Sequence, residues 1–179
     1  MRRVLTVVGT DYHPFHRLVT WVDMWCARRP EVDCLIQYGT STPPQHARGM
    51  AYLGHADLEA WMAQAAIVVC HGGPSTILEA RRHGLKPIVV PRRARLGEHV
   101  DDHQVRFVTH LVKRDLVLTV TTRQELESVL DQALDDPELV RASSTQEADT
   151  TAEAVQRFAA LVASLFRGRD DSPTSGRAR

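Results

Sequence analysis

The stretch AIVVCHGGPSTILE, residues 66–79, decides the fold of this chain. It begins as a continuous apolar run, passes through two glycines and continues into a helix-like pattern that Gly84 closes. A second apolar run, Ile88-Val89-Val90, comes next. This order of strand, glycine turn, helix and strand indicates one unit of an α/β fold.

The turn between the first strand and the helix suits a phosphate group. Gly72 and Gly73 allow close backbone approach and positive φ angles, and Ser75 and Thr76 are good helix N-caps. A helix N-terminus presents unpaired N–H groups and a partial positive charge. We therefore interpret the turn as a diphosphate site.

The rest of the chain repeats this alternation. Apolar runs without polar alternation predict buried parallel strands at 4–8, 34–38, 67–70, 88–90 and 115–120, with a short strand at 51–53. Helical periodicity predicts helices near 14–29, 58–65, 105–112, 122–135 and 155–166. We expect an α/β domain with a mostly parallel sheet and helices on both faces, spanning residues 1–166. Residues 167–179 hold little to bury and are expected to be a disordered tail.

Composition excludes several classes of protein. The 179 residues carry 22 basic and 22 acidic side chains, which argues against a strongly basic nucleic-acid binder. Cys26, Cys34 and Cys70 are odd in number and match no metal or redox spacing, so we expect buried thiols in a reducing compartment. No signal peptide is recognisable, and no run approaches the ~20 apolar residues that span a bilayer.

Ligands of parallel sheets sit at the carboxyl ends of the strands. Two loops there are candidates, one containing Gly9 and Thr10 and the other running from His71 to Thr76. Glu79 has two interpretations. Its spacing from Thr76 matches a capping box, and its carboxylate could instead accept two hydrogen bonds from a ribose diol.

The histidines are also open to two interpretations. His71 could donate to a phosphate oxygen or bond to backbone at the end of its strand. His13, in the first loop, is a candidate general base. His99 and His103 are four residues apart with Glu98, Asp101 and Asp102 nearby, which suggests a metal site. No HExxH pattern and no clear third ligand accompany them, so no metal site is expected.

Two further groups are polar or basic. Asp102, His103 and Gln104 lie near a helix start, where they could cap the helix or bind sugar hydroxyls. Three arginines, Arg92, Arg93 and Arg95, share one loop and could meet phosphate or acidic lipid, although solvation is the default expectation. No nucleophile elbow, Walker A motif or G-x-G-x-x-G fingerprint is present, which argues against a nicotinamide enzyme.

Taken together, HGGPSTILE (71–79), HGLKPIVVP (83–91) and DHQ (102–104) resemble the donor-binding half of GT-B glycosyltransferases. The opening TVVGTD (6–11) resembles the start of the family 28 C-terminal domain, and the short length resembles the stand-alone catalytic subunit of two-part transferases. These include bacterial exopolysaccharide glycosyltransferases and the dolichol-pathway N-acetylglucosaminyltransferase. The resemblance implies a Rossmann-like sheet and transfer of a sugar from a UDP-sugar, inverting and without a metal or other cofactor.

The resemblance also implies roles for individual residues. The UDP diphosphate is expected at Gly72, Gly73, Ser75 and Thr76, the ribose at Glu79 and the uracil near Gly54. The donor sugar is expected at Asp102, His103 and Gln104. The full set of expected donor-binding residues is Gly9, Thr10, Gly54, His71, Gly72, Gly73, Ser75, Thr76, Glu79, Asp102, His103 and Gln104.

The resemblance further implies a partner. A membrane-anchored subunit would bind a lipid-linked glycan acceptor, and this chain would work at the cytoplasmic face of the membrane through that partner. His13 is the local candidate for the catalytic base. The alternatives are a UDP-sugar hydrolase or epimerase, and a non-catalytic nucleotide-sugar-binding module.

Overall fold

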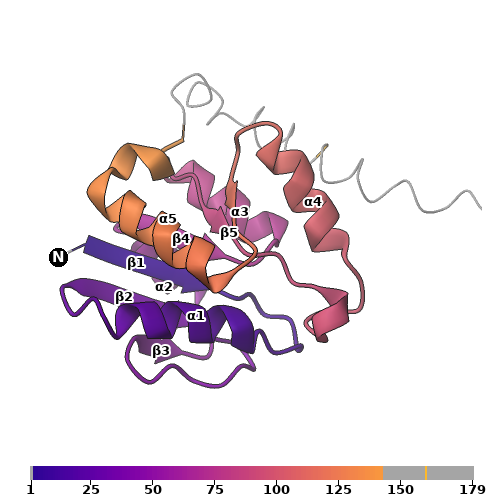
Figure 1. Ribbon diagram of the computed structural model, residues 1–179, viewed down its shortest axis with the longest axis horizontal. Coiled ribbons are helices and arrows are strands. Elements are labelled where there is room, and N and C mark those ends of the chain that lie inside the picture. Colours follow the sequence, from indigo (N-terminus) through magenta and orange to yellow (C-terminus); the bar gives the residue numbers. More distant parts are fainter. Residues whose placement is uncertain (1, 143–159, 161–179) are drawn as a thin grey trace, which may run out of the picture.

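The computed structural model describes residues 2–142 and residue 160 (Figure 1). Strands and helices alternate along the chain. The strands are β1 (Arg2–Val7), β2 (Val32–Gln37), β3 (Arg48–Met50), β4 (Ile67–Cys70), β5 (Ile88–Val89) and β6 (Leu118–Thr119). The helices are α1 (His16–Cys26), α2 (His55–Met62), α3 (Pro74–Arg82), α4 (His103–Val112) and α5 (Arg123–Asp135), with short 3₁₀ helices η1 (Ala94–Leu96) and η2 (Pro137–Val140).

The six strands form one parallel sheet in the order β3-β2-β1-β4-β5-β6. The central strand β1 pairs with β2 on one side and β4 on the other, so that Val4 lies opposite both Cys34 and Ile67. From β1 the chain moves outward to β3 and then returns to β4 on the other side. The chain leaves β1 for α1 on one face of the sheet and leaves β4 for α3 on the other, and open α/β sheets bind ligands at such a reversal.

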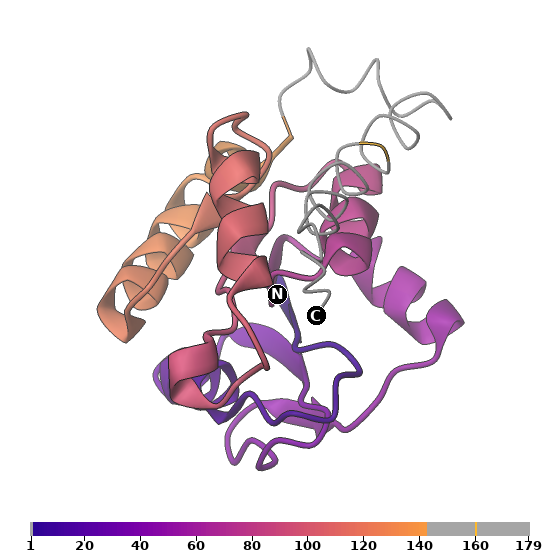
Figure 2. The same ribbon diagram turned by 90° about the vertical axis from the view of Figure 1, so that its right-hand side faces the viewer.

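Helices cover both faces of the sheet. On one face α1 and α5 pack through Leu18, Val22 and Leu130, and on the other α3 and α4 pack through Ile77 and Phe107. Figure 2 shows α5 and α3 on opposite sides of the strands. The β1 side chains alternate between the two cores, which explains why its apolar run has no polar alternation.

The predicted fold class is confirmed, with two differences in the elements. The short strand predicted at 51–53 is wrong, because β3 is Arg48–Met50. The last strand is shorter than predicted, since Asp115 has a φ of +55° in a turn and β6 begins only at Leu118. The helix predicted at 155–166, apart from Ala160, and the tail at 167–179 lie outside the described residues.

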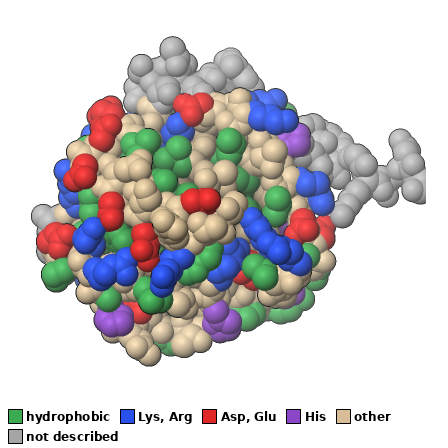
Figure 3. All heavy atoms as spheres, in the orientation of Figure 1, with side chains coloured by type: hydrophobic (Ala, Val, Ile, Leu, Met, Phe, Trp, Pro, Cys, Tyr) green, Lys and Arg blue, Asp and Glu red, His purple; other side chains and the backbone are tan. Residues whose placement is uncertain are grey.

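Acidic and basic side chains are interspersed on the face shown in Figure 3. Two ion pairs, Arg28–Glu127 (2.7 Å) and Arg29–Asp131 (2.9 Å), connect the turn after α1 to α5. Within residues 2–142 and 160, no helix has the length and apolar character needed to cross a membrane.

Candidate functional site

The turn after β4 leads directly into α3. Gly73 is the N-cap and Pro74 occupies the first helical position, which its fixed φ favours. Ser75 and Thr76 therefore lie inside the first turn, and no side chain caps the helix. The prediction that they are N-caps is wrong. Their N–H groups are among those that a helix leaves without an intrahelical partner.

The two glycines are required by close packing rather than by backbone conformation. A Cβ on Gly73 would lie 2.1 Å from His71 Nε2, and one on Gly72 would lie 2.9 Å from Gln104 Cβ. Close approach is thus confirmed. The predicted positive φ is wrong for both residues; Gly9 has one, at +84°.

Gln104 ties this turn to the neighbouring strand. Its Oε1 accepts hydrogen bonds from the backbone N–H groups of Gly72 and Arg92, both at 3.1 Å. Gln104 is buried at the start of α4. Its carbonyl therefore supports the glycine turn, and any contact with a donor sugar would have to come from its Nε2.

A pocket of about 330 Å³ opens at the carboxyl ends of β1, β2 and β4. Its volume falls in the range of small-molecule sites, roughly 300–1,000 Å³. Six of the predicted donor-binding residues line it: Gly9, Thr10, His71, Gly73, Ser75 and Thr76. Leu53, which precedes the predicted Gly54 in the chain, lines it as well. The lining residues are Val7, Gly9, Thr10, Gln37, Leu53, Leu58, His71, Gly73, Pro74, Ser75 and Thr76.

Gln37 is a pocket residue that the sequence reasoning missed. It is buried at the end of β2 and exchanges hydrogen bonds with Gly9, donating to its carbonyl and accepting from its N–H, both at 3.1 Å. It also donates to the Ala51 carbonyl at 2.7 Å. The sequence did hold a signal for it, because Gln37 is a polar residue at the end of the apolar run Cys34-Leu35-Ile36.

His71 lies beneath the glycine turn as a neutral ring. Burial, together with the positive charge of Arg92, lowers its pKa to about 4. Its Nδ1 lies 3.4 Å from the Val7 carbonyl. Of the two interpretations of His71, the strand-end contact with backbone is therefore present, and the ring is uncharged at neutral pH.

Glu79 takes no part in capping α3. Because α3 begins at Pro74, Thr76 is the third helical residue and cannot form the capping box with Glu79. Glu79 instead lies 3.2 Å from Arg82 Nη1 and 3.6 Å from His83 Nε2. The capping-box interpretation is wrong, and the ribose interpretation stays a prediction.

A chain of alternating histidines and aspartates lies beside the first loop. His13 Nδ1 lies 2.7 Å from Asp11 Oδ1, His99 Nε2 lies 3.1 Å from Asp11 Oδ2, and His103 Nδ1 lies 2.5 Å from Asp101 Oδ1. Burial alone would raise the pKa of Asp11, but hydrogen bonds from His13 and the charge of Arg92 hold it below its ordinary value.

Asp102 and Glu98 do not join this chain. Asp102 is exposed, and its Oδ1 accepts from the Ala94 N–H at 2.9 Å. Glu98 is buried and pairs with Arg17 through both oxygens, at 2.7 and 2.8 Å. The suggestion that Glu98 could be a metal ligand is therefore wrong.

Arg92 is fully buried, so the default expectation that it is solvated is wrong. Its guanidinium donates to the carbonyls of Val8, His13 and Glu98 at 2.7–3.0 Å and lies 4.7 Å above the Phe15 ring. It joins the loop after β1 to the loop after β5. Arg93 and Arg95 lie farther out, half-buried and exposed respectively.

Comparison with known proteins gives consistent results. The family model described as glycosyltransferase family 28 C-terminal domain matches residues 4–160. The UDP-N-acetylglucosamine–N-acetylmuramyl-(pentapeptide) pyrophosphoryl-undecaprenol N-acetylglucosamine transferase of Xanthomonas campestris pv. campestris (strain B100) is 34% identical over 113 residues, which cover 60% of this chain and 25% of that enzyme. The enzyme of the same name from Pseudomonas paraeruginosa (strain DSM 24068 / PA7) is 34% identical over 95 residues, covering 51% and 26%. The chain thus spans about a quarter of the length of these relatives.

Solved structures share the fold at low identity. Acinetobacter baumannii MurG aligns with a TM-score of 0.54 at 16% identity, covering 93% of this chain and 51% of that one. The calicheamicin glycosyltransferase CalG4 aligns with a TM-score of 0.61 at 14% identity, covering 96% and 43%. The fold of this chain is therefore that of half of a larger glycosyltransferase.

Proposed function

The chain belongs to the glycosyltransferase family 28 C-terminal domain family, and from that premise we propose that it is the donor-binding, catalytic subunit of a UDP-sugar-dependent glycosyltransferase. The observation that carries the proposal is the pocket at the reversal of the sheet, which Gly9, Thr10 and the start of α3 line together. UDP-N-acetylglucosamine is the proposed donor, since the Xanthomonas and Pseudomonas relatives are named for it.

The diphosphate is proposed to lie against the N-terminus of α3. The N–H groups of Ser75 and Thr76 and the hydroxyl of Thr10 would donate to its oxygens. The first turn of α3 contains no acidic residue, so no carboxylate there cancels its positive end. The same groups would stabilise the leaving diphosphate as negative charge develops on it, in an inverting reaction that needs no metal.

The rest of the donor is proposed to extend in two directions. The uracil would lie near Leu53 and Gly54, because Leu53 gives the pocket an apolar wall. Glu79 would accept the ribose hydroxyls. The sugar would lie toward Asp102, His103 and the Nε2 of Gln104, since Gln104 already contacts the glycine turn.

His13 is proposed as the general base. Asp11 Oδ1 lies 2.7 Å from His13 Nδ1, which favours a proton on Nδ1 and leaves Nε2 to accept one from the acceptor hydroxyl. A carboxylate that orients an imidazole in this way is a recurring arrangement in acid–base catalysis.

The acceptor half is proposed to reside on a membrane-anchored partner that presents a lipid-linked glycan, in polysaccharide biosynthesis at the cytoplasmic face of the membrane. The support is the resemblance to two-part transferases. The chain matches about a quarter of the Xanthomonas relative, whose name specifies a pyrophosphoryl-undecaprenol acceptor.

The testing experiment incubates the purified chain with radiolabelled UDP-N-acetylglucosamine, with and without membranes that contain the partner and lipid-linked acceptor. Transfer that requires the membranes and persists in excess EDTA is the expected result. Release of free sugar by the chain alone would indicate a hydrolase, and interconversion of the sugar an epimerase. Donor binding without turnover in every condition would indicate a binding module.

A further inference from the structure

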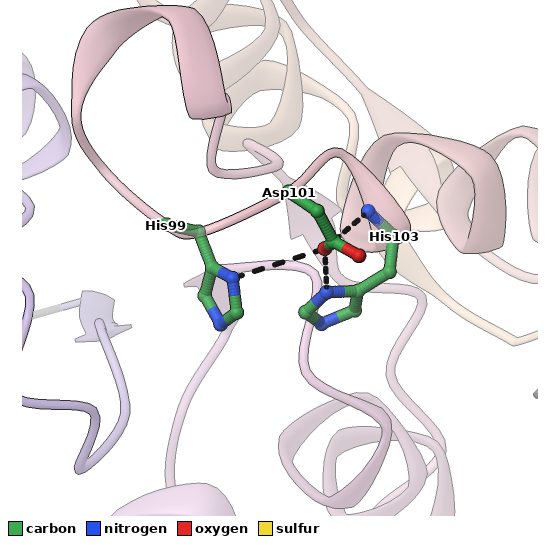
Figure 4. A group of neighbouring side chains, drawn as sticks. All are labelled: His99, Asp101 and His103. Carbon is green, nitrogen blue, oxygen red and sulfur yellow. Dashed lines mark hydrogen bonds and ion pairs between the residues drawn. The ribbon is translucent and has the colours of Figure 1, made fainter.

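Three metal-ligating side chains converge where the bend after η1 enters α4. His99, Asp101 and His103 occupy alternate positions, and their ligand atoms all lie within 4.8 Å of one another. Figure 4 shows the Asp101 carboxylate between the two imidazole rings. The three side chains are 15–25% exposed, so the cluster is partly shielded yet open to solvent.

His99 Nδ1 is the atom that the cluster leaves unsatisfied. It is buried and has no hydrogen-bond partner. The other ring nitrogen, Nε2, lies 3.1 Å from Asp11 Oδ2, which favours a proton on Nε2. The Nδ1 lone pair then faces Asp101 Oδ1 at 3.9 Å, where two acceptors oppose each other. Asp101 Oδ1 already accepts a hydrogen bond from the His103 backbone N–H at 3.0 Å, whereas a cation in the gap would give His99 Nδ1 the partner that it lacks.

The gap has the size that a zinc ion needs. Zn²⁺ binds imidazole nitrogen and carboxylate oxygen at about 2.0–2.2 Å, so two ligands on opposite sides of the ion are separated by at most about 4.2 Å. The separation of 3.9 Å between His99 Nδ1 and Asp101 Oδ1 is within that limit and closes to tetrahedral spacing by small side-chain rotations.

His103 supplies a third ligand from the first residue of α4. Its Nδ1 lies 2.5 Å from Asp101 Oδ1, so a proton now occupies the space between them. The ion would displace this proton as the His103 ring rotates away and the 2.5 Å contact opens to the tetrahedral ligand spacing of about 3.4 Å, and the ring would carry its remaining proton on Nε2. Arg106 lies 3.6 Å from the other oxygen, Asp101 Oδ2, and Oδ1 would bind the metal through the lone pair that does not accept the His103 backbone N–H.

We propose that His99, Asp101 and His103 form a binding site for one divalent transition-metal ion of the zinc class, with water as the fourth ligand. Asp11 supports the site from behind, because a carboxylate on the far nitrogen of a ligating histidine fixes its tautomer and raises its basicity. Two imidazoles in a set of three favour zinc over Mg²⁺ or Ca²⁺, which prefer oxygen ligands. The site differs from the sequence-based expectation of no metal. It shares His103 with the proposed donor-sugar contacts, but it does not depend on the proposed function, since ligation would use Nδ1 of that ring and no step of sugar transfer passes through the metal.

Isothermal titration calorimetry with ZnCl₂ tests the site on the full chain, prepared without a histidine tag and stripped with chelator. One equivalent is expected to bind, and His99→Gln and His103→Gln are each expected to weaken binding at least tenfold. Asp11→Asn is expected to weaken it about tenfold through its support of His99. His110→Gln, on the same helix but outside the cluster, is the matched control and should bind as the wild type does.

A second measurement covers variants that fail to fold. Imidazole resonances of the wild-type chain are followed by NMR during the zinc titration, and those of His99 and His103 should shift with the first equivalent while His55 and His110 stay in place. Absence of saturable zinc binding, equal binding by all folded variants, first shifts at other histidines, or tighter binding of MgCl₂ than of ZnCl₂ would each overturn the proposal.

Discussion

At the scale of single residues, the site is held in place by buried side chains that form hydrogen bonds with backbone N–H and C=O groups. Gln37 and Gln104 each use their carboxamides to hold a loop that carries a glycine, Gly9 in one case and Gly72 in the other. His71 fills the space that a Cβ on Gly73 would need. These contacts preorganise the turn, so ligand binding need not order it.

Glu79→Ala is expected to weaken UDP binding roughly 10–100-fold, because a carboxylate that accepts ribose hydroxyls contributes charged hydrogen bonds worth about 1.5–3 kcal/mol. Calorimetry with UDP measures the affinity. Arg82→Ala is the control, since it breaks the 3.2 Å ion pair with Glu79 and leaves the carboxylate in place. An unchanged UDP affinity in Glu79→Ala would exclude the ribose contact.

The lowered pKa of His71 predicts that the folded chain loses stability in mild acid. Its pKa is about 4 in the folded chain against an ordinary value of 6.5, so the unfolded chain binds the proton more readily. The contribution is complete above pH 6.5 and is lost as the pH falls toward 4, by at most about 3 kcal/mol. Urea unfolding at pH 7 and pH 4.5 should show a smaller drop for His71→Asn, which cannot titrate. Equal drops in both proteins would contradict the prediction.

At the scale of elements, the exact start of a helix decides what its side chains do. Because α3 starts at Pro74, Thr76 and Glu79 cannot form the predicted capping box. The same motif forms at α5, where Thr122 is the N-cap and exchanges hydrogen bonds with Glu125. Helix α1 also holds a loop: Asp23 accepts from the N–H groups of Gln45, His46 and Ala47 at 2.8–2.9 Å.

Asp23→Asn is expected to lower the free energy of unfolding by about 2–3 kcal/mol, because an amide cannot accept all three loop N–H groups without placing its own NH₂ against one of them. Urea unfolding at pH 7 measures the change. Glu59→Gln, on the exposed surface of α2, is the control and should change stability by less than about 0.5 kcal/mol. A loss for Asp23→Asn no greater than for the control would show that the loop is held by other contacts.

At the scale of the whole molecule, the reversal of strand order and one buried arginine assemble the site. The reversal places the loops after β1 and β4 next to each other. Arg92 then joins the loop after β1, through the Val8 and His13 carbonyls, to Glu98 in the loop after β5. Segments that lie far apart in the sequence thereby become one edge of the sheet.

Arg92→Lys is expected to destabilise the chain by about 2–4 kcal/mol, because an ammonium cannot reach three carbonyls in the planar arrangement of a guanidinium. UDP affinity should fall with it, since the loop that contains Gly9 is no longer held. Thermal unfolding and calorimetry measure the two effects. Arg95→Lys, exposed in the same loop, is the control. Wild-type stability and affinity in Arg92→Lys would contradict the role of Arg92.

The sequence by itself determined the α/β class, the strands β1, β2, β4 and β5 to within a few residues, and the glycine turn before α3. These depend on local patterns: apolar runs, glycine and proline positions, and helical periodicity. It also selected six of the residues that line the pocket, because the motif and the strand ends are both visible in the chain.

Only the tertiary structure decided the burial of Arg92, the roles of the two supporting glutamines and the contact of Asp11 with His99. Each depends on partners that the sheet order brings together, and sequence spacing carries no information about those partners. Gln104 illustrates the physical reason. Its neighbours Gly72 and Arg92 are 32 and 12 residues away, and a buried polar group acquires its role from whichever backbone groups the fold places within hydrogen-bond reach.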